Sequence, residues 1–178
     1  MKNTIKILSL TVATLFALSV SSSFAAGFAV LDIEKIAKES KAVHDIQGKV
    51  SKKQDDFQKE ITKKQSDLES DQKKLEAKKT ILSKEAFEKE QKAFEKKIDS
   101  LKDLVEKRQN SLKKASTEAM NKVNDKMKEI ITEIAKDKEL NLILPSSQVV
   151  FSAESLDISA EVLEKLNKKV TKMDVKFE

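Results

Sequence analysis

Apolar residues recur every seven positions over residues 33–138, which hold no proline and one glycine, Gly48. Lys, Glu, Gln and Ala fill most other positions, and these residues favour helices. Two seven-residue series follow each other in the first half: Ile36, Val43, Val50 and Phe57, then Ile61, Leu68, Leu75 and Leu82. The second half carries Phe87, Phe94 and Leu101, offset from Ile98, Val105, Leu112 and Ala119. This spacing keeps one seam toward a partner helix and predicts one very long helix or a long helical hairpin.

The apolar seam is interrupted by charged residues. The first series, when it is extended, meets Lys64, Asp71 and Lys78, and Arg108 interrupts the second half. Most turns of the first half therefore offer one apolar residue per heptad, where a stable coiled coil offers two. We expect arms that are helical but weakly held together and able to bend.

Strand-like apolar runs flank the helical stretch, at residues 28–33 before it and at 140–144 and 149–151 after it. Isolated strands leave backbone groups unpaired, so these runs should meet in one sheet. Only a chain that doubles back can bring them together. The midpoint falls near Ser83, which predicts an N-cap with Glu85 in the first turn of the second helix. At about 1.5 Å per residue, each arm would reach roughly 70 Å or more.

The flanking runs predict a small β body, in an α+β fold that is mostly α. Its predicted strand residues are Phe28, Val30, Leu31, Ile33, Leu142, Ile143, Leu144, Val149, Val150 and Phe151. We expect the helix to start around Glu34, and runs 140–144 and 149–151 to form a hairpin across the turn that begins at Pro145. Ser159 is the predicted N-cap of a short helix, and residues from about Thr171 are expected to fray. So few strands cannot bury themselves in a monomer, which favours an oligomer.

Residues 1–25 have the pattern of a secretory signal peptide. Lys2 and Lys6 give the positive start, residues 7–20 are apolar, and residues 23–25 read Ser-Phe-Ala, so the mature chain would begin at Ala26. An uncleaved membrane anchor is the alternative, but the apolar run is short for a span. Because no other long apolar run exists, we expect a soluble protein of the bacterial periplasm or the exterior. The predicted division is a body of residues 26–50 and 120–178 and an arm of residues 51–119.

Positive charge is concentrated near the predicted tips of the arms. Of the 178 residues 37% are charged, and residues 73–97 hold nine lysines against five acids. The charges either keep a helical face solvated or attract anionic partners such as acidic unfolded proteins, lipid headgroups or lipopolysaccharide. Nucleic acid is disfavoured, because acids are interspersed and phenylalanine is the only stacking aromatic.

Catalytic and metal-binding patterns are missing from the sequence. His44 is the single histidine and has no ligand spacing around it, and the absence of cysteine excludes disulfides and thiol chemistry. Neither a Gly-x-Ser-x-Gly motif nor a glycine-rich phosphate loop is present. The sequence therefore predicts a protein that is not an enzyme and that needs no ATP, metal or cofactor.

Three stretches of the mature chain resemble the Skp/OmpH family of periplasmic chaperones. They are FAVLDI at 28–33, LNLIL at 140–144 with VVF at 149–151, and LDISAEVLEKL at 156–166. The last stretch is similar to the family ending D-I-T-x-x-V-L, with Ser159 in place of Thr. The order of strand, long charged helical insertion, strands and terminal helix covers the whole mature chain.

The resemblance implies a homotrimer with a central β body and three helical hairpins around a cavity. It also implies an ATP-independent holdase that keeps unfolded outer-membrane proteins soluble in the periplasm. The candidate client-contact residues are Phe57, Phe87 and Phe94, with Lys73, Lys74, Lys78, Lys79, Lys84 and Lys89 supplying positive potential. Alternatively, the three phenylalanines pack inside the hairpin, because they lie on the seam registers.

Two other classes of function stay open. A coiled-coil scaffold or spacer of the envelope would have regular heptads and form a dimer, which the interrupted seam disfavours. A lipid- or lipopolysaccharide-binding protein would use the basic tips, and its affinity would fall steeply with salt.

Overall fold

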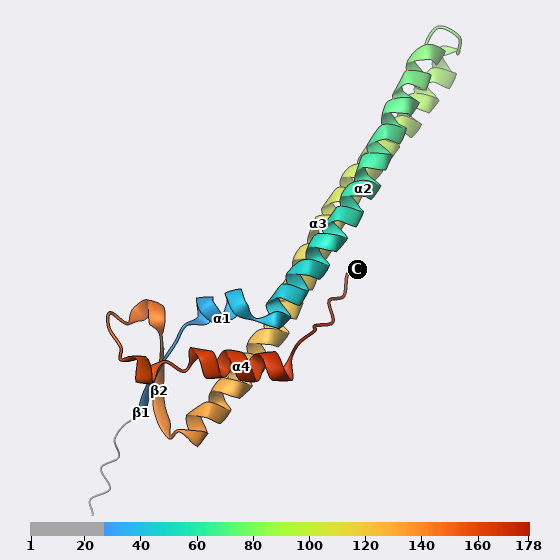
Figure 1. Ribbon diagram of the computed structural model, residues 1–178. Coiled ribbons are helices and arrows are strands. Elements are labelled where there is room, and N and C mark those ends of the chain that lie inside the picture. Colours follow the sequence, from blue (N-terminus) through green and yellow to red (C-terminus); the bar gives the residue numbers. More distant parts are fainter. Residues whose placement is uncertain (1–26) are drawn as a thin grey trace, which may run out of the picture.

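The structure, a computed structural model, describes residues 27–178 as a small body from which a long helical hairpin projects (Figure 1). The predicted signal peptide, residues 1–25, lies outside the described residues. None of the helices within residues 27–178 combines the length and the apolar character that crossing a membrane requires.

The elements follow the predicted order of strand, long helical insertion, strands and terminal helix, except that one strand follows the insertion where two were predicted. They are β1 (Gly27–Leu31), α1 (Ile33–Glu39), α2 (Lys41–Lys78), α3 (Lys84–Asp137), β2 (Leu140–Pro145), the 3-10 turns η1 (Ser146–Gln148) and η2 (Glu154–Leu156), and α4 (Ser159–Lys169). The predicted α+β fold, mostly α, is confirmed.

The two strands that flank the helical stretch pair in one parallel sheet. Phe28 lies opposite Leu142 and Val30 opposite Leu144, with an irregularity between Gly27 and Phe28. The outer edge of β1 is partly covered by the chain that leads into α4, because the Ile158 amide donates to the Val30 carbonyl oxygen at 3.0 Å. β1 and β2 are thus neighbours in the sheet, although the whole helical hairpin separates them along the chain.

The hairpin of α2 and α3, called the arm below, turns where the sequence predicts. The Ser83 hydroxyl accepts a hydrogen bond from the Ala86 amide, and Glu85 lies in the first turn of α3, so this N-cap is confirmed. At about 1.5 Å per residue, the 54 residues of α3 span roughly 81 Å. The 38 residues of α2 span only about 57 Å, which is less than the predicted 70 Å.

The difference comes from a break at Ser40 that the heptad pattern does not reveal. Ser40 is fully buried and has an extended backbone, with φ −71° and ψ 125°. Its amide donates to the Ile36 carbonyl and ends α1, while its hydroxyl accepts from the Val43 amide and starts α2. The Lys41 amide also donates to Asn167 of α4 at 2.8 Å. One serine thus redirects the chain from the body into the arm.

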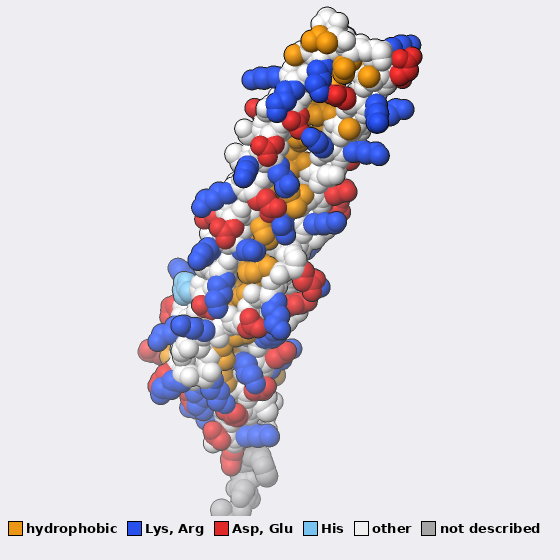
Figure 2. Space-filling model, turned by 90° about the vertical axis from the view of Figure 1, so that its right-hand side faces the viewer, with side chains coloured by type: hydrophobic (Ala, Val, Ile, Leu, Met, Phe, Trp, Pro, Cys, Tyr) orange, Lys and Arg blue, Asp and Glu red, His pale blue; other side chains and the backbone are white. Residues whose placement is uncertain are grey.

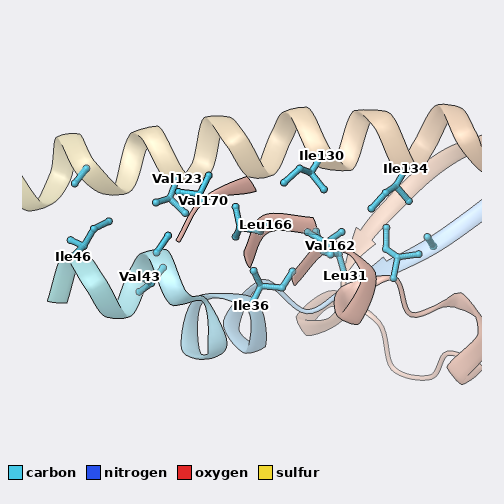
Figure 3. Packing of buried hydrophobic residues seen from close by; sticks show 14 residues of the cluster. Leu31, Ile36, Val43, Ile46, Val123, Ile130, Ile134, Val162, Leu166 and Val170 are labelled. Atoms are coloured by element: carbon cyan, nitrogen blue, oxygen red, sulfur yellow. The ribbon is translucent and has the colours of Figure 1, made fainter. Parts of the chain in front are cut away.

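The core of the body lies where α1, α4 and the sheet meet the base of the arm (Figure 3). Its fully buried side chains come from α1 (Ile36), α2 (Ile46), α3 (Ile130, Ile134) and α4 (Val162, Leu166). α3 contacts α2 in the arm and α4 and β2 in the body, so it serves both parts of the molecule.

Two strand predictions are wrong. Ile33 is the first residue of α1 and 47% exposed, because the Asp32 carboxylate accepts from the Lys35 amide and starts the helix there. No strand forms at 149–151 in the part of the chain that the structure describes. After Pro145 the chain turns through η1 and crosses to the far edge of β1 instead of returning along β2.

Ser159 is not the N-cap of α4, contrary to the sequence prediction. Its hydroxyl accepts from the Asp32 amide at 2.7 Å, and its own amide donates to the Asp157 carboxylate at 2.8 Å. Hydrogen bonds from Ser159 hold the pKa of Asp157 below its ordinary value. Ser159 therefore ties α4 to the end of β1, while Asp157 satisfies the start of the helix.

The segment from Thr171 onward does not fray, which also corrects the prediction. Val170 is buried, and Met173 and Val175 pack against the core. Val170 extends the apolar face of α4, so this face continues into the segment that follows the helix.

Gly27 is required by a close approach between the strands, whereas Gly48 is not. A Cβ atom on Gly27 would lie 2.7 Å from the Glu139 carbonyl oxygen and 3.1 Å from Leu140 Cα. Glu139 itself has a positive φ of 54°, so the backbone there is already constrained. A Cβ on Gly48 would meet no atom within 4 Å.

The two glycines provide a matched pair of stability tests. We expect Gly27→Ala to lower the free energy of unfolding by about 1–3 kcal/mol, because the added methyl group overlaps backbone. Gly48→Ala should raise it by roughly 0.5–1 kcal/mol, because alanine is the better helix former. Urea unfolding followed by circular dichroism measures both values. Equal stability of Gly27→Ala and the unchanged protein would contradict the strand geometry.

Candidate functional site

The upper part of the arm has an apolar seam but no buried side chain. Between residues 58 and 110 every seam residue is half-buried, whereas Phe57, Ser111, Ala115 and Ala119 below are buried. The half-buried seam residues are Ile61, Leu68, Leu75, Leu82, Phe87, Phe94, Ile98, Leu101, Leu104 and Val105. Figure 2 shows hydrophobic side chains running along one face of the arm between charged ones, and more of them at the tip. An open apolar strip with charged borders therefore extends along the arm.

The charges that interrupt the seam pair across it. Lys97 of α3 contacts Asp71 of α2 at 2.6 Å, and Lys78 contacts Glu90 at 2.8 Å. The hydrogen bond from Lys97 holds the pKa of Asp71 below its ordinary value. Exposed ion pairs of this kind each contribute about 0–1 kcal/mol, so they set the register of the helices more than they tighten the arm.

Arg108, which interrupts the predicted seam, joins the helices in a second way. Its guanidinium contacts Glu60 at 3.0 Å and lies 4.5 Å from the centre of the Phe57 ring. The Lys53 ammonium lies 4.9 Å from the same ring centre. Glu60 and Arg108 are 48 residues apart, so no local pattern in the sequence could reveal this pair.

The three candidate phenylalanines lie in two different environments. Phe57 is only 5% exposed and packs inside the hairpin, so it is accessible only if the helices separate. Phe87 and Phe94 are half-buried on the upper part of α3, near the tip. The structure therefore brings Phe87 and Phe94 onto one helix face and leaves Phe57 apart from them.

The six candidate lysines are all exposed, and two of them form ion pairs. Lys78 pairs with Glu90, and Lys74 lies 3.7 Å from Asp71. Lys73, Lys79, Lys84 and Lys89 form no ion pair with any of residues 27–178. The tip of the arm consequently keeps uncompensated positive charge.

An open groove lies between α2 and α3 in the upper arm. Its volume is about 590 Å³, and its lining combines Leu68, Leu101 and Leu104 with Lys64, Lys74 and Lys97. Asp67 and Asp71 also line it, so the groove offers apolar side chains among charges of both signs.

A second exposed apolar surface covers one face of the sheet and the loop after it, and we call it the sheet face. Phe28 is 51% exposed, Leu142 45%, and Val150 and Phe151 more than 80%. Leu144 belongs to the same face, and so does Val30, which pairs with Leu144 but is buried. Ala29, Leu31 and Ile143 lie on the other face, toward the core. Val149 is half-buried. Within residues 27–178, β2 pairs only with β1, so its other edge is also open.

Residues 27–178 contain no group of three or more His, Asp or Glu side chains that could hold a metal ion. His44 is exposed on α2. The described arrangement offers apolar and charged contact surfaces.

Comparison with known proteins places this geometry in a family. A solved structure of a candidate outer membrane chaperone (OmpH-like) from Caulobacter crescentus CB15 has the same fold, with a TM-score of 0.79 and 17% sequence identity. The alignment covers 86% of this chain and 90% of that one. Among curated proteins, none matches this chain in sequence. The family described as "Outer membrane protein (OmpH-like)" matches residues 27–166, which is most of the chain. The chain therefore belongs to the OmpH-like family of outer membrane proteins.

Proposed function

We propose that this protein is an ATP-independent holdase chaperone of the periplasm, which binds unfolded outer-membrane proteins between the arms of a homotrimer and prevents their aggregation. The observation that carries the proposal is the apolar strip of the upper arm, which is half-buried over its whole length and bordered by charge. The chaperone description of the structurally similar Caulobacter protein supports the same role.

The strip suits a chain of no fixed sequence. Half-buried apolar side chains give many weak contacts, while the neighbouring charges keep the free arm in solution and prevent the arms from associating with each other. A seam without buried residues also lets the helices shift, so the arm can adapt to clients of different size. A regular coiled-coil spacer would instead bury two apolar residues in each heptad.

The sheet face supports the homotrimer. A two-stranded sheet with one exposed apolar face is marginal by itself, and its stability increases when further strands or apolar surfaces cover it. The open edge of β2 offers unpaired backbone groups to another strand. Three copies that join through this surface would place three arms around a common space.

The client-binding test uses the mature chain, residues 26–178, and a urea-unfolded β-barrel membrane protein diluted into buffer without nucleotide. We expect the chain to suppress light scattering by the client. Phe87→Gln with Phe94→Gln should weaken client binding roughly 3- to 10-fold, because each loses part of a buried aromatic contact of about 1 kcal/mol or less. Ala77→Gln, an exposed change on the same arm, is the matched control. Unchanged binding by the double variant with intact helicity would exclude these two residues as client contacts.

The assembly test uses the native mass of the mature chain. We expect a trimer, and Leu142→Glu with Phe151→Glu should convert it to monomers, because charge placed in an apolar interface is strongly disfavoured. Ile81→Glu is the matched control, since Ile81 is 79% exposed at the tip of the arm, far from the sheet face. A trimer that survives the double change would mean that the copies join elsewhere.

A second candidate function, binding to lipopolysaccharide or anionic lipid, is favoured by the unpaired lysines at the tip. Lys79→Gln, Lys84→Gln and Lys89→Gln together should weaken binding to vesicles of anionic lipid about 100-fold, from roughly 1 kcal/mol per lysine. Client binding through the apolar strip should persist in high salt, whereas vesicle binding should disappear. Vesicle binding that the triple change leaves intact would reject the basic tip as its site.

A further inference from the structure

The C-terminal segment, residues 171–178, lies along the base of the arm. In Figure 1 it leaves α4 and runs beside the paired helices toward the label C. Met173, Val175 and Phe177 are half-buried, whereas Lys172, Asp174, Lys176 and Glu178 are exposed. This alternation is typical of an extended strand that lays one apolar face on a surface.

The main chain of the segment is held at Met173 by two residues of α2. The Met173 amide donates to the Asp45 carboxylate at 2.8 Å, and the Lys49 ammonium donates to the Met173 carbonyl oxygen. Asp45 and Lys49 also pair with each other at 2.8 Å, one helical turn apart. Hydrogen bonds from Lys49 and then from the Met173 amide hold the pKa of Asp45 below its ordinary value. Both contacts are to backbone atoms, so this anchor does not depend on which side chain the bound residue carries.

The side chains of the segment meet the arm further up. The Lys53 ammonium lies 6.0 Å from the centre of the Phe177 ring, and Lys114 contacts Glu178 at 2.6 Å. Glu178 borders an open groove of about 930 Å³, which Leu104, Arg108, Ser111 and Thr117 also line. Ser111 is 93% buried there, and its hydroxyl has no hydrogen-bond partner among the described residues. The surface thus combines a backbone anchor, an apolar track that receives Met173 and Val175, lysines that contact Phe177 and Glu178, and an unused hydroxyl.

We propose that this surface is a binding site for extended client segments in which apolar and polar residues alternate, and that residues 171–178 are its intramolecular occupant. The strands of membrane β-barrels have this alternation, with one face toward lipid. A backbone anchor combined with an apolar track is the mode by which proteins accept extended peptides of varied sequence. The assignment of β-barrel segments as natural ligands rests on the proposed chaperone function, whereas the peptide site itself does not.

The test compares two variants of the full mature chain. Val175→Ser with Phe177→Ser removes apolar contacts and releases the segment, and Lys172→Ser with Lys176→Ser changes its exposed positions as the matched control. The probe is a fluorescent ten-residue peptide of alternating Val and Thr, and a peptide of the same composition with the valines in one block is the second control. Fluorescence anisotropy measures both affinities.

We expect the released variant to bind the alternating peptide roughly tenfold more tightly than the unchanged chain does, because the competing occupant is weakened. An unlabelled peptide of residues 171–178 should displace the probe. The chain has no cysteine, so Thr117→Cys can carry the only photo-crosslinker, and it should capture the probe in the released variant. Circular dichroism establishes that each variant is folded.

Equal affinity in the released and unchanged chains, equal binding of the block peptide, or failure of residues 171–178 to compete would each overturn the proposal. These readouts do not depend on the aggregation assay. If the chain suppresses client aggregation but the released variant shows no gain in peptide binding, the chaperone function stands and the peptide site is rejected. A gain in peptide binding without suppression would keep the site and reject the chaperone function.

Discussion

The parallel pairing of β1 with β2 joins two segments that are separated along the chain by the entire arm. Because parallel neighbours need a long crossover, the arm can be inserted between them without disturbing the sheet. Gly27 lets the strands approach closely where they start, and Ser159 ties the end of β1 to α4. With the ends of the hairpin fixed in this way, α2 and α3 leave the body side by side, and the direction of the arm follows from that geometry.

The arm itself is held by a different balance of forces. At its base, small residues such as Ala115 and Ala119 let the helices approach and bury the seam. Higher up, larger apolar residues alternate with charges, and ion pairs such as Lys97–Asp71 replace buried packing. Each of these pairs is weak in water, so the upper arm keeps its helices in register while leaving apolar surface accessible. The interrupted seam thus has two consequences. The helices of the upper arm pack less tightly than those at its base, and their apolar side chains stay accessible to a partner.

The surfaces that the fold leaves uncovered differ in character and therefore in the partner that each suits. The sheet face is compact, almost entirely apolar and next to an open strand edge, which suits another copy of the chain. The upper arm is long and mixed, which suits many loose contacts. The base of the arm is already occupied by residues 171–178, which are held through their backbone by Asp45 and Lys49.

The helical hairpin, its turn at Ser83 and the meeting of the two flanking strands could be predicted from the sequence, because they depend on periodicity and local capping. The break at Ser40, the role of Ser159 and the path of residues 149–151 could not, since each depends on partners that are distant in the sequence. The Glu60–Arg108 pair could not be predicted for the same reason, because the heptad pattern does not show which residue of the other helix faces Arg108. The alternation of Met173, Val175 and Phe177 was visible in the sequence. Its meaning was not, because an extended segment is ordered only by the surface that it contacts.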